Sequence, residues 1–370
     1  MKKRRPLIYL ILALVLAFGS CNDPVFYIIS QEQPIAKPYI DGSPTNFVVY
    51  GSSSKMYVAS GSIIYSYDGT RWTQFFRPGG RVVQLAATNT YLYALFLKGS
   101  SNETRHIAFY NGSSWTDMNL NIKPLSIFTA NNVLFICAGN GDNNGNAIYY
   151  SQNNSSPTSI SGASGISILN GIAHDGTNYF LCTNSSGIFH VPNSLGTATP
   201  IPGSSIGFSG IISIGSSIVA IKRERGNLYN VTTTAIADKG ISFGGVSSGA
   251  LAIWENNTSE KLLLAGRDSD VKYTTGSIAY GYMEIYIAPS GNDVEGSFEE
   301  PGIRARSSVA DNKLYISTLR KHPVHHIIQT SAAIDTNRTL FASTQQKGVW
   351  SYRVRSGTPQ WNAESEDDYR

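Results

Sequence analysis

A repeated unit of short strand-like runs and polar turns is the feature of this sequence that most limits its fold. The two clearest copies are KMYVASGSIIYSYDGTRWT at residues 55–73 and YLYALF followed by HIAFYNGSSWT within residues 91–116. Their second halves, YSYDGTRWT and AFYNGSSWT, align in aromatic, turn, glycine and tryptophan positions. Because self-similarity at a regular period is the signature of a repeat architecture, the chain is expected to stack similar units.

Further copies continue along the chain: VLFICAG with AIYYSQ, NYFLCTNSSGIFHV, SIVAIKRERGNLYNV, KLLLAGRDSDVKY and TLFASTQQKGVWSYRVRSGTPQWNAE. The turns that precede these copies fall near residues 54, 89, 131, 177, 215, 257 and 337. Most intervals are 35 to 45 residues, and the last, of 80 residues, holds either two units or one unit with an insertion. This period is typical of the blades of a β-propeller.

We therefore predict an all-β chain in which residues 47–364 form a β-propeller of four-stranded antiparallel blades. Seven blades fit the repeat best, with six and eight as alternatives. Runs rich in Val, Ile, Tyr and Phe lie between Gly, Asn and Ser turns, and no convincing amphipathic helix follows Cys21. Because one blade cannot bury both of its faces alone, the closed ring is the stable object.

Glycine and tryptophan recur in the unit for local structural reasons. The turns Asp68-Gly69 and Asn111-Gly112 supply residues that tolerate a positive φ, which tight hairpins need. Trp72 and Trp115 follow these turns and carry enough apolar area to fill the space between blades. We predict structural roles for these residues.

The N-terminus is typical of an exported protein. Residues 2–5 are Lys-Lys-Arg-Arg, and an apolar run of 12 residues follows from Leu7 to Phe18, as in a secretory signal peptide. A helix of that length spans about 18 Å, which is too short for the roughly 30 Å hydrocarbon core of a bilayer. Gly19 and Ser20 then precede Cys21. We predict cleavage after residue 20 and lipidation of Cys21, with an ordinary cleaved signal peptide as the alternative.

The stretch LAFGSC resembles the lipobox of bacterial lipoproteins, and its phenylalanine resembles the relaxed boxes of spirochaetes. Together with the closing segment GVWSYR…PQWNAE, it resembles spirochaete-type lipoproteins with a β-propeller-like repeat domain. The resemblance implies export and a lipid anchor in the cell membrane or outer membrane, on the periplasmic or the surface face. Residues 1–20 would be the signal peptide, and 21–46 the lipidated cysteine, a tether and a ring-closing strand at Val25–Ser30. Residues 365–370 would be a C-terminal tail.

Removal of the signal peptide would change the net charge that the protein presents to a partner. The full chain carries 29 Lys and Arg against 25 Asp and Glu, but four of the cations lie in residues 1–20. The mature chain is therefore formally neutral, with 25 charges of each sign. Because binding to nucleic acid requires a basic face that neutralises phosphates, no nucleic-acid partner is expected.

Two cysteines remain besides Cys21, the expected lipidation site. Cys137 and Cys182 lie at matching places of the apolar runs LFICAG and NYFLCTN. An exported chain with two cysteines could form one disulfide. The apolar surroundings favour two small buried hydrophobic residues instead.

Three connecting segments are candidate partner-binding sites, because functional residues concentrate on loops and in concave sites. They are marked by Arg223 and Arg225 in KRERG, by Tyr280 and Tyr282 in AYGYMEIYIA, and by His325 and His326 in HPVHH. A solvated hairpin tip and an outer strand pair are the simpler interpretations of the first two. The histidines could bind zinc, but consecutive residues of an extended segment point to opposite faces. An exposed basic loop beside Arg320 and Lys321 is therefore favoured for the third.

The sequence contains no nucleophile elbow, Walker loop or dinucleotide-binding glycine pattern in a suitable context. We therefore expect a non-enzymatic propeller, without cofactor or metal, that binds an envelope or host protein or acts as a scaffold. The alternative is a carbohydrate-binding or carbohydrate-active propeller, in which two carboxylates or three arginines would face the central channel. Glu295, Glu299 and Glu300 are the candidate carboxylates for such chemistry.

Overall fold

The computed structural model describes residues 38–51, 55–99, 104–139, 146–223, 226–242, 247–255, 261–267, 271–272, 278–279, 281–299, 319, 322–330, 338–355 and 358–365. The chain divides into two units, one of residues 38–364 and the other of residues 1–37 and 365–370. The expected signal peptide, Cys21 and the strand expected at Val25–Ser30 lie outside the described residues. Arg225 and Tyr280 also lie outside them.

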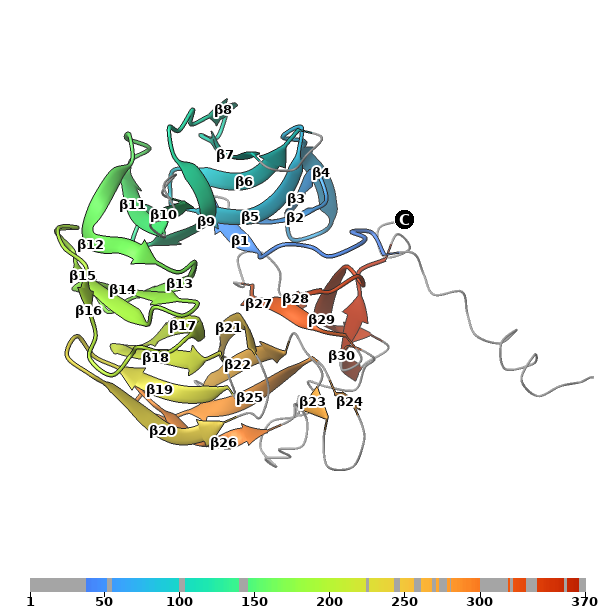
Figure 1. Ribbon diagram of the computed structural model, residues 1–370. Coiled ribbons are helices and arrows are strands. Elements are labelled where there is room, and N and C mark those ends of the chain that lie inside the picture. The colour runs from blue at the N-terminus through green and yellow to red at the C-terminus, as the bar shows by residue number, and fades with distance from the viewer. Residues whose placement is uncertain are drawn as a thin grey trace, which may run out of the picture. The chain divides into compact units, whose positions relative to one another are not determined.

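Residues 38–364 form a ring of seven four-stranded antiparallel sheets, which confirms the predicted seven-bladed β-propeller (Figure 1). The first strands of most successive blades contact one another around the axis. The strands of each blade are given from the axis outwards. The first blade comprises β1 (Val48–Tyr50), β2 (Lys55–Ser60), β3 (Ile63–Tyr67) and β4 (Trp72–Phe76), and the second comprises β5 (Arg81–Ala87), β6 (Leu92–Lys98), β7 (Thr104–Tyr110) and β8 (Trp115–Asp117). The third blade comprises β9 (Lys123–Ala130), β10 (Val133–Gly139), β11 (Asn146–Gln152) and β12 (Thr158–Ile166), and the fourth comprises β13 (Leu169–His174), β14 (Asn178–Thr183), β15 (Ile188–Pro192) and β16 (Thr199–Pro200).

The last three blades follow the same plan, with one exception in the sixth. They comprise β17 (Phe208–Ile214), β18 (Ser217–Lys222), β19 (Asn227–Val231) and β20 (Ile236–Ser242); β21 (Ser247–Glu255), β22 (Lys261–Arg267), β25 (Tyr282–Ile287) and β26 (Val294–Glu299); β27 (Val324–Gln329), β28 (Arg338–Thr344), β29 (Val349–Arg355) and β30 (Thr358–Ala363). In the sixth blade a separate pair, β23 (Val271–Lys272) and β24 (Ile278–Ala279), is inserted between the second and third strands.

This insertion accounts for part of the long interval near the end of the repeat, and the 24 residues between β26 and β27 account for more. The interval between the turns near residues 257 and 337 contains the rest of the sixth blade, the β23–β24 pair and the start of the seventh blade. Of the two alternatives, one unit with an insertion is therefore correct. None of the segments that the structure describes is an α-helix long and apolar enough to span a bilayer.

Apolar side chains are buried mainly between neighbouring blades. Six hydrophobic clusters each join two successive blades, from the first pair to the sixth and seventh. Between blades three and four, for example, the rings of Phe135 and Tyr179 lie with centroids 5.0 Å apart. Trp115 stacks on Phe76 of the first blade at a centroid distance of 4.5 Å. Trp115 therefore fills the space between two blades, as predicted.

The interface between the last and first blades is aromatic. Trp72 of β4 is fully buried, and its ring centroid lies 5.6 Å from that of Phe341 on β28. Tyr67 of β3 packs on the same Phe341 at 5.1 Å, and Phe47 lies 6.3 Å from Trp72. Trp72 thus has the predicted inter-blade role, at the place where the ring closes.

Among the described residues, the first and last blades share no strand, and the sheet of the seventh blade consists of β27–β30. Backbone bonds join the ends instead: the N–H of Tyr39 donates to the carbonyl of Glu364 at 2.9 Å, and that of Gly348 donates to Gly42 at 3.0 Å. Gly348 has a φ of +68°, and a Cβ there would lie 2.1 Å from the carbonyl oxygen of Ile40. This close approach therefore requires a glycine.

The hairpin turns use the predicted chemistry. The Oδ1 atom of Asp68 accepts the N–H groups of Thr70 and Arg71, each at 3.0 Å, and Gly69 has a φ of +95°. Partial burial raises the pKa of Asp68, but the hydrogen bonds from Thr70 and Arg71 outweigh it and hold the pKa below its ordinary value. Asn111 makes the corresponding contacts in the second blade.

The two cysteines belong to different inter-blade cores. Cys137 of β10 lies in the cluster between blades three and four, and Cys182 of β14 lies in the cluster between blades four and five. Both are fully buried and unpaired. Burial raises the pKa of both thiols, as expected for structural rather than reactive cysteines. The prediction of two small buried hydrophobic residues is confirmed.

Candidate functional site

Two sets of connections lie at one end of the ring, which we call the axial face. Each first strand begins at this end. Because the strands alternate in direction, the connections between second and third strands, and those between blades, lie there too. The turn that carries Arg223, the segment that leads to Tyr282 and the start of β27 all belong to this set. The three segments chosen from the sequence therefore converge on one face.

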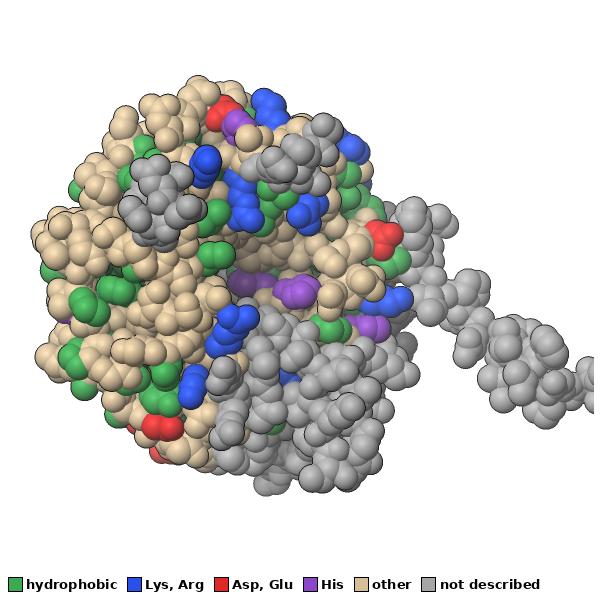
Figure 2. All heavy atoms as spheres, in the orientation of Figure 1, with side chains coloured by type: hydrophobic (Ala, Val, Ile, Leu, Met, Phe, Trp, Pro, Cys, Tyr) green, Lys and Arg blue, Asp and Glu red, His purple; other side chains and the backbone are tan. Residues whose placement is uncertain are grey.

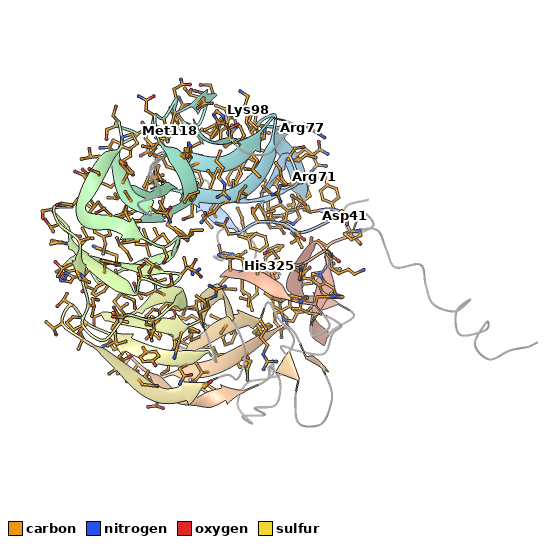
Figure 3. The ribbon with its side chains drawn as sticks, in the orientation of Figure 1. Asp41, Arg71, Arg77, Lys98, Met118 and His325 are labelled. Atoms are coloured by element: carbon orange, nitrogen blue, oxygen red, sulfur yellow. The ribbon has the colours of Figure 1, made fainter. Side chains whose placement is uncertain are left out.

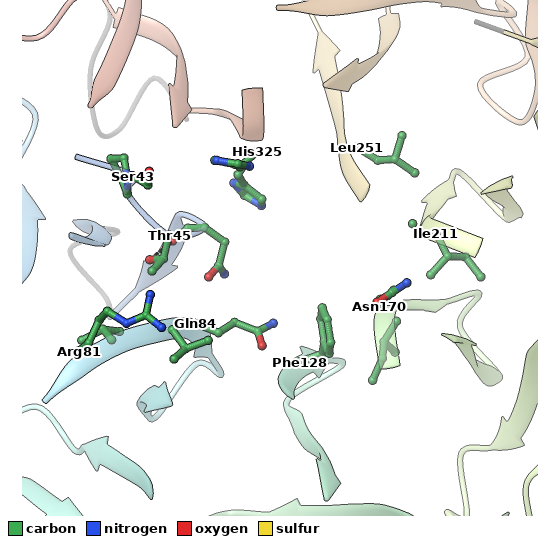
Figure 4. A pocket seen from close by; sticks show the side chains of 17 residues that line it. Ser43, Thr45, Arg81, Gln84, Phe128, Asn170, Ile211, Leu251 and His325 are labelled. Atoms are coloured by element: carbon green, nitrogen blue, oxygen red, sulfur yellow. Dashed lines mark hydrogen bonds between the residues drawn. The ribbon is translucent and has the colours of Figure 1, made fainter. Parts of the chain in front are cut away.

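A cavity of about 500 Å³ lies on the axis near this face. Its walls come from all seven blades, each contributing its first strand or the segment just before it (Figure 4). The lining residues are 43–46, 81–84, Phe128, 170–172, 210–211, Leu251 and 325–326. The face is hollowed near its centre in the space-filling view (Figure 2). A concave site bounded by so many elements is the first candidate for binding.

His325 and His326 both line this cavity, although consecutive residues of a regular strand point to opposite faces. A β-bulge explains the difference: Val324 pairs with Thr344 and His326 pairs with Ser343, so His325 is the extra residue of β27. The expectation of opposite faces, and the interpretation of this segment as an exposed loop, are wrong. Within the described residues, no group of three His, Cys, Asp or Glu side chains could hold a metal ion.

His326 connects the last blade to the first. Its Nδ1 accepts a hydrogen bond from the backbone N–H of Phe47 at 3.2 Å, and the two rings lie 5.8 Å apart. Because Nδ1 accepts, the neutral imidazole carries its proton on Nε2. Burial lowers the pKa of His326 to about 4. The imidazole is therefore neutral at pH 7.

Polar side chains of other first strands also bind the backbone of the neighbouring blade. Asn46 donates to the carbonyl of Leu85 at 2.7 Å and accepts its N–H at 2.9 Å. Gln84 accepts the N–H of Ile127 at 3.0 Å. The same kind of contact is made by Asn170, Ser213 and Gln329. These residues were not predicted; the available signal is a single amide within an apolar run, such as Gln84 in RVVQLAA.

Arg223 is exposed, and its Nη1 donates to Oδ1 of Asn184 at 2.5 Å. The same oxygen accepts from Asn170 at 3.4 Å, so Arg223 is linked to the cavity wall. Tyr282 differs because it is only 1% exposed and accepts the indole N–H of Trp361 at 3.1 Å. Its ring belongs to the core between blades six and seven. The expectation that Tyr282 lies on an exposed partner-binding loop is thus corrected.

Cationic side chains gather around the hollow, whereas acidic ones lie towards the margin of the face (Figure 2). Arg77 and Lys98 are exposed on connections of the first two blades (Figure 3). Lys123 is exposed at the start of β9, and Arg223 follows β18. Arg81 lines the cavity, and its guanidinium has no ion-pair partner among the described residues. The described part of the face therefore has a positive character, although the mature chain would be formally neutral.

Two of the residues considered for sugar chemistry belong to a strand far from the axis. Glu295 and Glu299 belong to β26, the outermost strand of the sixth blade, and Glu300 lies outside the described residues. Among the described residues that line the cavity, none is Asp or Glu. Glu295 and Glu299 therefore do not form the pair at the channel that a carbohydrate-active propeller would need.

The fold and this site define a seven-bladed β-propeller with an axial cavity lined by both polar and apolar residues. No family model matches the chain, and no curated protein matches it. The similarities that do exist are to solved structures.

Three of these structures illustrate the likeness. YCF48 bound to D1 peptide has a TM-score of 0.51 and 11% identity, over 88% of this chain and 96% of that one. The extracellular domain attributed to a hybrid two-component system of B. thetaiotaomicron has a TM-score of 0.54 and 16% identity, over 88% of this chain and 40% of that one. A chain of the mitotic checkpoint complex has a TM-score of 0.52 and 11% identity, over 88% and 96%. At these identities the likeness concerns the fold alone.

Proposed function

We propose that this protein is a non-enzymatic lipoprotein of the bacterial envelope that binds a protein partner through its axial face. The observation that carries the proposal is the gathering of exposed cationic side chains around the hollow of that face. Such a surface favours a partner with a complementary acidic patch, because charge complementarity speeds association and excludes other partners. In the solved structures of the same fold, one propeller holds a peptide and another belongs to a multiprotein complex.

Charge reversal on the axial face tests whether a protein partner binds there. The double variant Arg77→Glu/Lys123→Glu changes two exposed side chains of that face. We expect recovery of the partner from detergent-solubilised membranes to fall by about tenfold, because each reversal replaces an attraction with a repulsion of roughly 0.5–1 kcal/mol. Recovery by the unmodified protein should also fall as salt is raised, since exposed charges are screened.

The opposite end of the ring provides the matched control. Lys55 lies at the turn after β1 and Arg71 at the turn before β4, and both are exposed. The double variant Lys55→Glu/Arg71→Glu therefore makes the same change in net charge away from the axial face. Equal losses in the two double variants, or no reproducible partner for the unmodified protein, would contradict the proposal.

The membrane anchor is tested at Cys21. Cys21→Ser removes the thiol to which lipid would be attached, and we expect the protein to move from the membrane fraction to the soluble fraction of the cell envelope. Two or three acyl chains hold a protein durably at a bilayer, at about 0.8 kcal/mol per buried CH₂, whereas a propeller without them would have no such hold. Membrane association that is unchanged in the Cys21→Ser protein would contradict the anchor.

A further inference from the structure

We propose that the axial cavity binds a small organic anion with an apolar body, of the class of aromatic or aliphatic monocarboxylates. This site is separate from the partner proposed above and does not depend on it. The proposal comes from the wall of the cavity, which is divided into a side of hydrogen-bond donors and a side of apolar groups.

The donor side comes from the first, second and seventh blades. Arg81 and Gln84 lie on β5, and His326 lies on β27. The Oε1 atom of Gln84 is occupied by the N–H of Ile127, so its amide NH₂ is the group left for a ligand. His326 uses Nδ1 to accept from Phe47, so its Nε2–H is likewise left as a donor. In the close view, the labelled Arg81, Gln84 and His325 lie on the same side of the cavity as Ser43 and Thr45 (Figure 4).

The charge of this side is positive and uncompensated. The guanidinium of Arg81 has no ion-pair partner in the described part of the chain, and no described lining residue carries a carboxylate. A hydrogen bond from a charged donor to a carboxylate is roughly twice as strong as one between neutral groups. The donor side is therefore suited to an oxyanion rather than to a neutral or cationic group.

The opposite side is mainly apolar and comes from the third to the sixth blades. Phe128, Ile172, Ile211 and Leu251 line it, one from each of β9, β13, β17 and β21. Figure 4 shows Ile211 and Leu251 across the cavity from Arg81, and Phe128 beside the end of the Gln84 side chain, where the apolar side begins. Asn170 is the polar residue on this side, and its amide nitrogen is already bound to the carbonyl of Phe208 at 2.7 Å.

Both sides must be used for a ligand to gain full affinity. The cavity of about 500 Å³ is of the size that holds small molecules. An inorganic anion or acetate would leave the apolar wall in contact with water. A neutral apolar molecule would displace water from Arg81 without offering it an acceptor, which costs free energy. An anionic head joined to an apolar body satisfies the two walls together.

Three probes separate these contributions. The mature protein is titrated with 4-phenylbutyrate, which has the anionic head and the body, with 4-phenylbutyramide, which has the same body with a neutral head, and with acetate, which has the anionic head alone. Binding is measured by calorimetry and by ligand-observed NMR. We expect 4-phenylbutyrate to bind about tenfold or more tightly than either of the other two, the factor expected for one charge-assisted hydrogen bond with its apolar contacts.

Three variants locate the binding. Arg81→Gln should weaken 4-phenylbutyrate about tenfold and the amide much less, because it removes the cation that a carboxylate, but not a neutral amide, would pair with. Leu251→Thr should weaken the acid and the amide alike, by about threefold, because it removes apolar surface. Lys98→Gln removes an exposed cation that does not line the cavity and should change neither affinity. Circular dichroism and thermal unfolding establish that each variant is folded.

Several outcomes would overturn the proposal. Equal affinities for the acid and its amide would show that the donor side does not recognise the anion. Loss of binding in Lys98→Gln as large as in Arg81→Gln would indicate general attraction to the positive face. The absence of any binding up to about 10 mM, the limit of weak specific recognition, would remove the site.

Discussion

Replacing Trp72 with alanine should lower the free energy of unfolding by about 3–5 kcal/mol, the loss typical of a buried aromatic side chain in a packed core. Trp72 is fully buried and packs against Tyr67 and Phe341, so the change leaves a cavity between the first and last blades. In the described part of the chain no strand is shared between these two blades, so their side-chain contacts help the backbone bonds of Tyr39 and Gly348 to hold the ring closed. Urea unfolding of the mature protein, followed by intrinsic fluorescence and circular dichroism, measures the effect.

A neighbouring surface residue provides the control for this experiment. Arg71 precedes Trp72 in the chain but is exposed, and Arg71→Ala should change stability by less than about 0.5 kcal/mol. If the Trp72→Ala protein unfolds at the same urea concentration as the Arg71→Ala protein, the aromatic junction does not hold the ring closed.

Acidification should weaken the same junction through His326. The pKa of His326 is lowered by burial to about 4 in the folded protein, against an ordinary value near 6.5. The unfolded chain therefore binds a proton first as the pH falls, so stability is fully present above about pH 6.5 and is lost progressively down to about pH 4. The imidazole borders the cavity and is only partly shielded from solvent. We therefore expect the free energy of unfolding to fall by roughly 2 kcal/mol, which is less than the energy equivalent of the whole pKa shift. Urea unfolding at half-unit pH steps measures it.

A substitution at the same place isolates this contribution. His326→Gln keeps an acceptor for the N–H of Phe47 but has no titratable group, so it should flatten the pH dependence between about 6.5 and 4. Asp68 and Asp175, whose pKa values hydrogen bonds hold below the ordinary value despite partial burial, lose their contributions at lower pH. A His326→Gln protein with an unchanged pH profile between 6.5 and 4 would exclude His326 as the source.

The fold could be predicted because the residues that mark each repeat, namely turn residues and apolar strand runs, can be recognised over short stretches of sequence. Each of the seven turns located in the sequence separates the first and second strands of one blade, from the turn after β1 to that after β27. Turn residues and alternating apolar runs favour turns and strands through contacts between residues that are close in the chain. A single sequence is therefore enough to locate the turns and strands. The sixth blade was ambiguous because the run at Tyr282–Ile287 has the same pattern whether it starts a new unit or continues an old one. Only the pairing of β25 with β22 decides this.

The candidate site could be predicted only in part. The segment with Arg223 was found because connections between strands are where a repeat fold exposes polar residues. The segment with His325 was found as well, although it belongs to strand β27 and not to a loop. The joint orientation of His325 and His326 was missed, since it depends on a bulge set by the pairing of β27 with β28. The role of Gln84 was missed as well, because its partner Ile127 belongs to the next blade, 43 residues away. No local pattern encodes a contact of that kind.

Within the residues that the structure describes, each blade of this ring is assembled from its own stretch of chain, the seventh included. Adding or deleting one complete repeat in the gene would therefore leave every remaining sheet whole and would alter only the angle at which neighbours meet. A propeller fastened by a shared strand lacks this freedom, because its first and last segments must remain matched. The number of blades can accordingly change by recombination between repeats, and the width of the central opening would change with it.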